Sequence, residues 1–320
     1  MIKKVFLSSA FRGWVLEGII RESAKAVGNK ITIIYVPNRK SDYFRILDLF
    51  KYLLHKNTKQ PILIVNQNTF FDLLTRKKMA ARKAQIRIFF THSTNIEEFY
   101  DYYENFSTSV EKILVMNNSD RLKLVERGIT SQKVVTIYGA IDSTVYYPLN
   151  KTQDLEYSID PFVIIAGDCK PRKNPSRIYE VIRYMEDTTF ILHGSGWTSY
   201  LSENSLELPN NAEIKEFNLS DNPTLMRQAS TYLSLSDIEG GPYTTLEALA
   251  SGTPVVATNT GWNSEFISSS NGYLIENDFT VADIAINIQQ AMRLKRECFS
   301  RSLLPNFLSW SNLGYKIYKL

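Results

Sequence analysis

The sequence predicts an α/β protein built from two doubly wound parallel sheets in series, with a cleft between the two domains. Short, continuous runs of apolar and β-branched residues alternate with longer patterns of helical period, which is typical of parallel sheets covered on both faces. The alternation stops once, in a polar segment with two prolines at 140–161, and then starts again. The length of 320 residues also favours two domains over one core.

The first domain is predicted over residues 1–148, because each apolar run in this part is short enough for a strand. The expected strands lie at 3–9, 30–36, 61–67, 86–93, 111–117 and 133–139, and the expected helices at 14–28, 42–56, 70–84 and 119–128.

The second domain is predicted over residues 149–304 and repeats the same rhythm. The amphipathic end of the chain, residues 305–320, is predicted to form a helix that packs back on the first domain. The expected strands of the second domain lie at 162–168, 189–196, 212–218, 230–236, 253–259 and 272–277, and the expected helices at 176–185, 222–229, 243–252 and 281–295.

The composition excludes several classes of protein. With 44% hydrophobic and 22% charged residues, the chain is typical of a soluble globular protein. No apolar run approaches the ~20 residues of a membrane span, and the apolar part of the N-terminus is too short for a signal peptide. Two cysteines, Cys169 and Cys298, form neither a disulfide framework nor a zinc site. These features favour a cytoplasmic protein, and they allow peripheral contact with the inner face of the membrane.

The two halves of the chain differ in charge. Residues 1–150 hold 23 Lys and Arg against 13 Asp and Glu, whereas residues 151–320 hold 14 against 20. This asymmetry predicts that the first half faces lipid headgroups, nucleic acid or an acidic glycan, and a well-solvated basic surface explains it equally well. One predicted helix carries a cationic stripe that suits an anionic membrane, although an ordinary solvated helix fits at least as well. The stripe comprises Arg76, Lys77, Lys78, Arg82, Lys83 and Arg87.

The stretch SLSDIEGGPYTTLEALASG, residues 234–252, is predicted to be a strand, a turn and a helix. Gly240 and Gly241 form the turn, where a glycine lets the backbone approach a ligand, and Pro242 suits the first helical turn. The start of such a helix is an anion site that suits a diphosphate. The amides expected to face the ligand are those of Tyr243, Thr244 and Thr245.

Two carboxylates flank this turn with seven residues between them. Glu247 lies one turn into the helix, where it could accept hydrogen bonds from a ribose diol, and Glu239 lies at the strand end. Each has an ordinary explanation, because Glu247 could stabilise the helix electrostatically and Glu239 could be an exposed turn residue. The pair around two glycines favours a ligand site.

A second candidate motif is the basic loop in IIAGDCKPRKNPSRIYEVI. A strand ends at Gly167, and Lys170, Arg172 and Lys173 lead into a helix, which suits a phosphate group. By itself the loop is equally consistent with a solvated basic turn.

Together these motifs resemble glycosyltransferases of family 4, a retaining, sugar-nucleotide-dependent family with the GT-B fold. EGGPYTTLEALASGTPVVAT is similar to the family's two-glutamate signature, AGDCKPRKN to its phosphate loop, and HGSG to the next strand. VVTIYGAIDSTVYYP is similar to the segment that enters the linker, and FFTHS to a strand that ends in histidine. The likeness is strong from about 160 to 290 and topological before about 85.

The resemblance implies a role for each matched residue. Lys173 binds the donor diphosphate, Glu247 the ribose hydroxyls, and Glu239 the donor sugar near its reacting carbon. His92 approaches the donor sugar from the first domain. The co-substrate implied is a UDP- or GDP-sugar, with no further cofactor.

Two departures from the family pattern stand out. Asp168 takes the place of the usual arginine after the loop glycine, and Lys170 or Arg172 could supply the missing charge. The usual glycine-rich first loop is replaced by SSAFRGWVLEG, in which Arg12 and Gly13 are expected to do its work.

The predicted function is transfer of a sugar from a nucleotide donor to a glycan or lipid-linked acceptor in cell-surface polysaccharide or glycolipid synthesis. The sequence contains no Asp-x-Asp motif, so Lys173 and the helix start are expected to replace a divalent ion. Two alternatives stay open. They are a glycosyltransferase that acts on nucleic acid, and a nucleotide-sugar-binding protein that Asp168 has impaired in catalysis.

Overall fold

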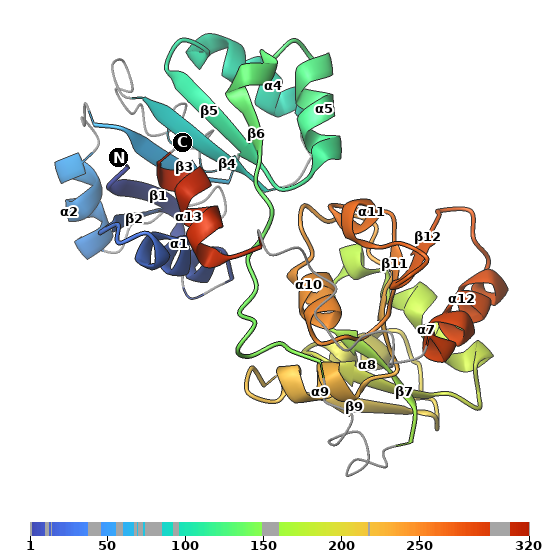
Figure 1. Ribbon diagram of the computed structural model, residues 1–320. Helices are drawn as coiled ribbons and strands as arrows, with labels where there is room; N and C mark the ends of the chain where they lie inside the picture. The colour runs from blue at the N-terminus through green and yellow to red at the C-terminus, as the bar shows by residue number, and fades with distance from the viewer. Residues whose placement is uncertain are drawn as a thin grey trace. The chain divides into compact units, whose positions relative to one another are not determined.

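The computed structural model describes residues 2–9, 13, 15–37, 46–55, 60–66, 69, 73, 85–91, 96–148, 160–216, 218–294 and 308–319. Contacts divide the chain into two compact units, one of Met1–Ala140 with Phe307–Leu320 and the other of Ile141–Asn306. Each unit has helices packed around its own parallel sheet (Figure 1).

The described part of the N-terminal unit contains a parallel sheet in the order β2-β1-β3-β4-β5-β6. Its strands are β1 (Lys4–Ser8), β2 (Thr32–Val36), β3 (Ile62–Val65), β4 (Ile86–Phe90), β5 (Val110–Val115) and β6 (Val134–Thr136). Its helices are α1 (Val15–Ala26), α2 (Ile46–His55), α4 (Ile96–Phe106), α5 (Asn118–Glu126), the short η3 (Ser131–Lys133) and the terminal α13 (Trp310–Tyr318).

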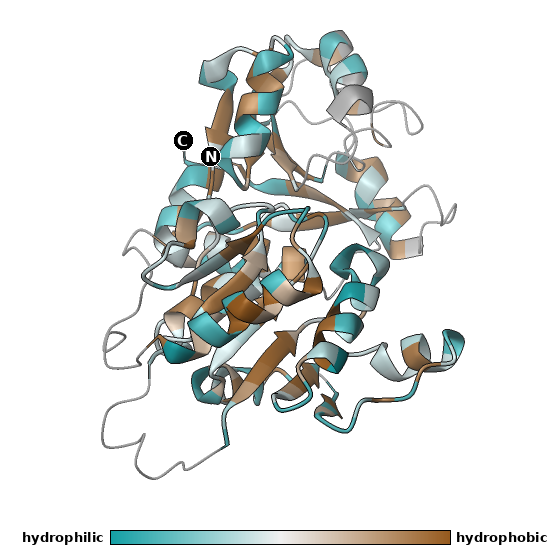
Figure 2. Cartoon of the chain, turned by 90° about the vertical axis from the view of Figure 1, so that its right-hand side faces the viewer, coloured by the Kyte–Doolittle hydropathy of each residue, from teal (hydrophilic) through white to brown (hydrophobic). Residues whose placement is uncertain are grey.

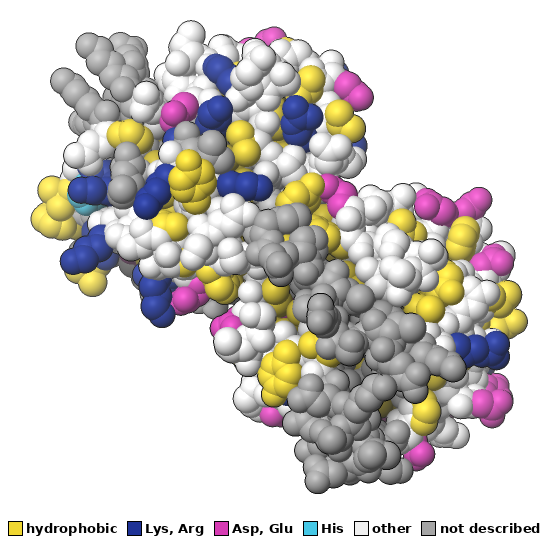
Figure 3. Space-filling model, viewed as in Figure 1, with side chains coloured by type: hydrophobic (Ala, Val, Ile, Leu, Met, Phe, Trp, Pro, Cys, Tyr) yellow, Lys and Arg dark blue, Asp and Glu magenta, His cyan; other side chains and the backbone are white. Residues whose placement is uncertain are grey.

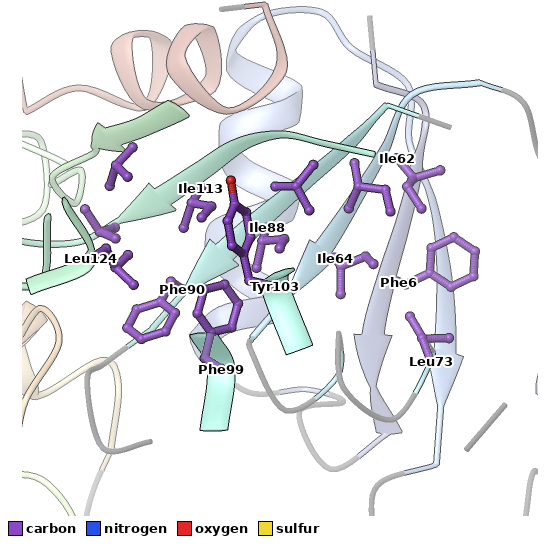
Figure 4. Packing of buried hydrophobic residues seen from close by; sticks show 14 of the residues in the cluster. Phe6, Ile62, Ile64, Leu73, Ile88, Phe90, Phe99, Tyr103, Ile113 and Leu124 are labelled. Carbon is purple, nitrogen blue, oxygen red and sulfur yellow. The ribbon is translucent and has the colours of Figure 1, made fainter. Parts of the chain in front are cut away.

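The core of this unit lies between the sheet and the helices that cover it. On β4, Ile88 and Phe90 point to the same side, as alternate residues of a strand do, and both are fully buried. Phe90 meets the edge of Phe99 on α4, with ring centroids 5.1 Å apart, and Phe99 stacks on Tyr103 one turn later (Figure 4). The aromatic residues of α4 therefore hold this helix on the sheet.

The last helix, α13, packs against α1 within the N-terminal unit (Figure 1). The hydroxyl of Tyr318 donates to the carbonyl oxygen of Ile20 at 2.8 Å. A side chain at Gly314 would meet the carbonyl oxygen of Ser23 at 2.1 Å, so only glycine allows the two helices to lie this close.

The described part of the C-terminal unit contains a second parallel sheet, in the order β12-β11-β10-β7-β8-β9. Its strands are β7 (Phe162–Ala166), β8 (Thr189–His193), β9 (Ala212–Lys215), β10 (Thr231–Ser234), β11 (Val255–Thr258) and β12 (Gly272–Ile275). Its helices are η4 (Pro171–Lys173), α7 (Pro175–Tyr184), α8 (Trp197–Glu203), α9 (Asn222–Gln228), α10 (Tyr243–Ala250), α11 (Asn263–Phe266) and α12 (Val281–Arg293).

Helices cover both faces of this second sheet. All five residues of β7 are buried, and Figure 2 shows the strands as continuous hydrophobic segments. Val163 and Ile165 belong to one core cluster, while Phe162, Ile164 and Ala166 belong to the other. This alternation explains why the strands lack the apolar–polar pattern of a sheet with one solvated face.

Residues 141–148 belong to the C-terminal unit, whereas the sequence pattern predicts a boundary after residue 148. The reason is a set of contacts with α9 that no local pattern reveals. Arg227 donates to the carbonyl oxygen of Val145 at 2.7 Å, and its guanidinium lies 4.4 Å from the centre of the Tyr147 ring. Asn222 donates to the hydroxyl of Tyr146 at 3.0 Å.

Candidate functional site

The candidate site lies at the carboxyl ends of β7 and β10, which are neighbours in the centre of the C-terminal sheet. From β7 the chain continues to β8 and β9 on one side, and from β10 to β11 and β12 on the other. The sheet therefore reverses its strand order here, and in open α/β sheets ligands bind at such a switch point. The basic loop follows β7, and the turn with Glu239 follows β10.

Two cations of the first loop share one carboxylate of the second. Arg172 Nη1 lies 2.6 Å from Glu239 Oε1, and Lys173 Nζ lies 2.5 Å from the same oxygen. The side chain of Glu239 is only 10% exposed. Burial opposes its ionisation, but the charges and hydrogen bonds of Lys173 and Arg172 outweigh burial and lower its pKa below the ordinary value. Glu239 is therefore a carboxylate at neutral pH.

The two loops are also joined by their backbones. The amide of Asp237 donates to the carbonyl oxygen of Arg172 at 2.9 Å. Asn174 Nδ2 donates to Asp237 Oδ1 at 3.0 Å. Asn174 has a φ of +55°, a left-handed conformation that asparagine tolerates better than most residues, and it separates η4 from α7. These contacts fix Lys173 opposite Glu239.

A close approach of two glycines fixes the start of the basic loop. Gly167, with a φ of +120°, directly follows β7, and Gly194 directly follows the neighbouring β8. A Cβ at Gly194 would lie 2.0 Å from the carbonyl oxygen of Gly167. The amide of Cys169 then donates to the carbonyl oxygen of Ser195 at 2.8 Å, which ties the two loops together.

We expect Gly194→Ala to destabilise the C-terminal unit by about 3 kcal/mol, because the overlapping atoms belong to backbone that cannot rotate away. For a unit of this size, that loss lowers the midpoint of thermal unfolding by roughly 6–12 °C. Gly18→Ala is the matched control, since no atom lies within 4 Å of a Cβ at this exposed position in α1. It should shift stability upward by about 1 kcal/mol or less. Equal effects of both variants would show that the approach of Gly194 to Gly167 is not constrained.

Asp168 stands where the resembled family has arginine, and its carboxylate is bound by two neighbouring side chains. Lys170 Nζ lies 3.0 Å from Asp168 Oδ2, and the hydroxyl of Ser195 donates to Asp168 Oδ1 at 2.8 Å. Burial opposes ionisation of Asp168, but its hydrogen bonds to Lys170 and Ser195 outweigh that effect and lower its pKa. Lys170 thus neutralises Asp168, while Arg172 contacts Glu239. The negative charge of Asp168 is therefore paired with Lys170 and leaves Arg172 and Lys173 to Glu239.

The start of α10 differs in part from the expected anion site. Thr245 was expected to offer its amide to a ligand, but that amide donates to the carbonyl oxygen of Pro242 at 3.0 Å, which makes this expectation wrong. The Thr245 hydroxyl is buried and donates to Asn263 Oδ1 at 2.9 Å. The hydroxyl of Thr244 pairs with that of Tyr232 at 2.6 Å. The hydroxyls of both threonines therefore form hydrogen bonds within the C-terminal unit.

The glycine turn before α10 is packed by the loop that follows β11. A Cβ at Gly261, which has a φ of +58°, would lie 2.9 Å from the carbonyl oxygen of Gly240. The buried Trp262 donates through Nε1 to the carbonyl oxygen of Pro242 at 3.3 Å and meets the ring of Tyr243 edge-on at 5.5 Å. These contacts set where the helix begins and where Tyr243 lies.

Glu247 lies in a small polar cluster between α10, α9 and the linker. Asn222 Nδ2 donates to Glu247 Oε2 at 3.0 Å and to the hydroxyl of Tyr146 at 3.0 Å. The Tyr146 hydroxyl also hydrogen-bonds with the carboxylate. Burial is the largest effect on Glu247 and raises its pKa, although both hydrogen bonds oppose this. Burial, and secondly the charge of Glu247, also raise the pKa of Tyr146.

We expect Glu247→Gln to stabilise the fold at neutral pH while it weakens nucleotide binding. Because the pKa of Glu247 is raised on folding, the folded state loses stability as pH rises from about 4.5 through that raised pKa. Glutamine removes this loss and keeps an acceptor for Asn222. Urea unfolding from pH 4.5 to 8 should show that the free energy of unfolding of the variant increases relative to that of the wild-type protein as pH rises.

The low end of the same titration is the internal control, because Glu247 is largely protonated there and the two proteins should agree. Nucleotide affinity at pH 7.5 should fall about 10–100-fold, the effect of losing hydrogen bonds to a charged acceptor. A variant that is destabilised at every pH, with unchanged nucleotide affinity, would contradict both roles of Glu247.

Several residues of the first domain were predicted to bind the donor or a membrane. The structure gives some of them other partners, and the rest lie outside the described residues. Gly13 has a φ of +74°, and its amide donates to Glu17 Oε2 at 2.8 Å, so a carboxylate of the chain accepts from this amide. Glu17 also binds Arg21 and accepts from the Tyr35 hydroxyl at 2.6 Å. The predicted residues that lie outside the described part of the chain are Arg12, Arg76, Lys77, Lys78, Arg82, Lys83 and His92.

Arg87 was predicted to extend the cationic stripe toward a membrane, and this prediction is wrong. It lies on β4, and it is buried. Its Nε lies 3.2 Å from Glu111 Oε2, and its Nη1 donates to the carbonyl oxygen of Ile317 at 3.0 Å, near the C-terminal end of α13. Arg87 therefore links the sheet to the terminal helix, where a cation is electrostatically favourable.

The comparisons with known proteins agree with this architecture. Residues 149–301 match the family model described as glycosyl transferases group 1. The chain is 22% identical over 206 residues to the UDP-Gal:alpha-D-GlcNAc-diphosphoundecaprenol alpha-1,3-galactosyltransferase of Escherichia coli, covering 58% of this chain and 53% of that protein. The chain spans about half the length of the curated relatives it matches.

Solved structures show the fold over almost the whole chain. Anabaena Alr3699/HepE, in complex with UDP and glucose, superposes with a TM-score of 0.71 at 16% identity, covering 99% of this chain and 96% of that one. Sucrose-phosphate synthase from Thermosynechococcus elongatus gives a TM-score of 0.74 at 13% identity, covering 98% and 97%. The chain therefore has the GT-B fold.

Proposed function

We propose that this protein is a retaining glycosyltransferase that moves a sugar from a nucleoside-diphosphate sugar to a glycan or lipid-linked acceptor. The observation that carries the proposal is the arrangement of Lys173 and Arg172 around Glu239 at the switch point of the C-terminal sheet. The proposal assigns the two cations to the diphosphate and the carboxylate to the positive charge that develops on the sugar. The match of residues 149–301 to glycosyl transferases group 1 supports it independently.

The donor is proposed to be a UDP-sugar. HepE is described in complex with UDP and glucose, and the Escherichia coli relative is named for a UDP-Gal donor. In the proposed complex, Lys173 and Arg172 bind the diphosphate, Glu247 binds the ribose hydroxyls, and Glu239 lies beside the donor sugar. Asn222 and Tyr146 hold Glu247 in place, and no motif in the sequence points to either residue.

The proposed chemistry follows from charge. The bond between the anomeric carbon and the phosphate oxygen breaks, the acceptor oxygen bonds to the same face of that carbon, and the acceptor proton passes to the departing phosphate. Negative charge grows on the diphosphate, and a donor fixed at that position typically contributes about 3 kcal/mol. We propose that Lys173 and Arg172 supply this stabilisation, so that the reaction needs no divalent ion.

The acceptor is proposed to be a glycan or a lipid-linked glycan of the cell surface. The Escherichia coli relative is named for a diphosphoundecaprenol acceptor, and WaaB, an outer core galactosyltransferase of lipopolysaccharide, superposes with a TM-score of 0.65 at 14% identity over 99% of both chains. These names describe the acceptors of the relatives. For this protein, the acceptor is proposed and is a separate step from the proposed sugar transfer.

The test is a thermal-shift panel of UDP-, GDP- and ADP-sugars, followed by a transfer or hydrolysis assay in excess chelator with the anomeric configuration of the product measured by NMR. We expect UDP-sugars to raise the unfolding midpoint, since a ligand that binds the folded state stabilises it. We also expect turnover with chelator present and retained configuration. Stabilisation without turnover would favour the catalytically impaired binding protein, and salt-sensitive retention on DNA would favour a nucleic acid acceptor. A panel with no stabilising donor would refute the proposal.

A further inference from the structure

The linker segment 141–148 contributes a buried hydroxyl to the proposed nucleotide site. Tyr146 is 7% exposed, and its hydroxyl accepts from Asn222 Nδ2 at 3.0 Å and donates to the carboxylate of Glu247. Phenylalanine would fill almost the same volume without burying a polar group, so the packing of the linker does not require this hydroxyl. Its role therefore lies at the two side chains that it contacts.

The backbone around Tyr146 is held on α9 from both sides. Arg227 donates to the carbonyl oxygen of Val145 at 2.7 Å, and its guanidinium lies 4.4 Å from the centre of the Tyr147 ring. These contacts fix the segment in the protein without a ligand, so the hydroxyl of Tyr146 holds the Glu247 carboxylate at little further cost in conformational entropy. Tyr146 is therefore preorganised for this contact.

The side-chain amide of Asn222 is not fully used by the fold. Its Nδ2 donates to Tyr146 and to Glu247, whereas its Oδ1 is buried and accepts from no group in the described part of the chain. A buried acceptor without a donor costs stability. Because nearly all buried polar groups are paired, an exception of this kind indicates that the cluster is arranged for a function and not only for folding.

Glu247 has room for a ligand that carries two neighbouring hydroxyls. A carboxylate has about four positions that accept hydrogen bonds, and Tyr146 and Asn222 occupy two of them. Glu247 is half-buried as a residue, so it reaches the surface of the unit. The remaining positions match in number the two donors of a ribose diol.

The charge around Glu247 makes its two hydrogen bonds important. Burial raises the pKa of Glu247, and the hydrogen bonds from Asn222 and Tyr146 oppose that rise. Residues 151–320 carry 14 Lys and Arg against 20 Asp and Glu, and Figure 3 shows more acidic than basic side chains on the visible face of the C-terminal unit. The net charge of this half of the chain therefore also disfavours ionisation of Glu247.

Other ionisable side chains also act on the cluster. The charge of Arg227 on α9 opposes the rise in the pKa of Tyr146, and burial raises the pKa of Tyr232 on β10 to about 12. Burial, and secondly the charge of Glu247, raise the pKa of Tyr146 itself. Both tyrosines therefore keep their protons near neutral pH, and Glu247 is the member of the cluster whose charge changes as the solution is acidified.

We propose that Tyr146 is a positioning residue of the nucleotide site: its hydroxyl holds the Glu247 carboxylate for both hydroxyls of a ribose, so that the linker helps the protein to select ribonucleotides over their 2′-deoxy forms. This inference rests on the proposed function, because Glu247 must contact the ribose. It adds a residue to that function and names the part of the ligand that the residue controls. Tyr146 acts through Glu247 and not on the reacting sugar or phosphate.

The test is calorimetric titration of the full chain with UDP and with 2′-deoxy-UDP from pH 5 to 8. The two ligands carry the same diphosphate, so the ratio of their affinities cancels the titration of the phosphates. We expect Tyr146→Phe to weaken UDP binding about fivefold at pH 7.5 and 2′-deoxy-UDP binding about twofold or less, because the carboxylate that meets the 2′-hydroxyl loses a bond. With a saturating donor, kcat should stay within about twofold of the wild-type value.

The pH profile separates a positioning role from a purely structural one. Loss of the Tyr146 hydroxyl removes a bond that lowers the pKa of Glu247, so this carboxylate is protonated at a higher pH in the variant. The preference for UDP over 2′-deoxy-UDP should therefore decrease on acidification in both proteins, and the decrease should begin at a higher pH in Tyr146→Phe. A residue that only supports the fold would weaken both ligands equally at every pH.

Tyr147→Phe is the matched control, because it removes a hydroxyl from the next residue along the chain. The Tyr147 ring is 42% exposed, and phenylalanine keeps the ring over the guanidinium of Arg227. This variant should bind both nucleotides as the wild-type protein does. Both variants should also unfold within about 4 °C of the wild-type midpoint, the scale of a small change in stability.

Two results would overturn the inference while the proposed function stands. One is a wild-type preference for UDP that stays constant from pH 5 to 8, a measurement that needs no variant. The other is a Tyr146→Phe protein that keeps both the wild-type preference and its pH profile. A wild-type protein that binds neither UDP nor any UDP-sugar would refute the proposed function, and this inference with it.

Discussion

Glu239→Gln is expected to lower kcat by about 1,000-fold while UDP binds as tightly as before or more tightly. The loss of rate follows because glutamine cannot stabilise positive charge that develops on the sugar, and fixed electrostatic groups of this kind contribute about 10²–10³ in kcat. The gain in affinity follows because Glu239 accepts from both Arg172 and Lys173 in the structure. Glutamine is neutral and nearly the same size, so both cations gain net charge toward a phosphate. We expect UDP affinity to rise about three- to tenfold.

The measurements are steady-state kinetics with the best donor of the panel and calorimetric titration with UDP. Asp237→Asn is the matched control, because it makes the same change of carboxylate to amide two residues earlier in the same loop. Asp237 is exposed, its Oδ1 accepts from Asn174, and an asparagine keeps that acceptor. Its kcat should stay within about threefold of the wild-type value, the scale of surface substitutions.

Two outcomes for Glu239→Gln would contradict its assigned role. Full transfer would remove Glu239 from the chemistry. A parallel loss of transfer and of UDP binding would show that the carboxylate only holds the loops together. The prediction is therefore a split between kcat and nucleotide affinity, which a purely structural residue does not produce.

The strands were the part of the fold that the sequence predicted most directly. β7 is buried on both faces, so its five residues form one apolar run that needs no knowledge of its neighbours. Helix α4 was missed, because the aromatic residues that bind it to the sheet also fit a surface cluster. Phe99 and Tyr103 belong to the core only because Phe90 lies opposite them on β4.

The candidate site was predicted as a set of motifs and not as a set of contacts. Both glutamates and the basic loop carry local signals, yet the ion pairs that define the site join residues 66 and 67 positions apart. The expectation for the Thr245 amide failed for a related reason. That amide has an acceptor within the chain, the carbonyl oxygen of Pro242, and a helix start with its own acceptor looks the same in sequence as one that faces a ligand.

The position of Asn222 shows the same limit for Glu247. The sequence places Glu247 on α10 and suggests either a ribose ligand or a structural role. The structure adds an amide from α9 and a hydroxyl from the linker, and both lie far from Glu247 in the sequence. A carboxylate whose pKa is raised by burial, held by two hydrogen bonds, is suited to accept more hydrogen bonds from hydroxyl groups.

Lys173→Met is expected to lower kcat/KM about 100-fold, with most of the loss in kcat. One cation at the departing phosphate typically contributes about 3 kcal/mol to the transition state, because charge on the diphosphate grows as the bond breaks. The fold should survive, because Arg172 still pairs with Glu239 and the backbone bond from Asp237 to Arg172 keeps the loops joined. Lys170→Met is the control. Lys170 pairs with Asp168, so its loss should change kcat/KM by about fivefold or less.

A double-mutant cycle with Glu239→Gln tests whether the ion pair controls the strength of Lys173. In the wild-type protein Glu239 neutralises part of the ammonium charge, so Lys173→Met should cost only a little UDP affinity. In the Glu239→Gln background the same change removes a cation whose closest partner is gone, so the loss should be about tenfold larger. Equal losses in both backgrounds would show that Lys173 and Glu239 are not coupled in solution.

A larger loss in the background that lacks Glu239 would mean that this carboxylate sets how much positive charge the diphosphate meets. The enzyme would then hold the nucleotide less tightly than its cations allow, which favours product release after each transfer.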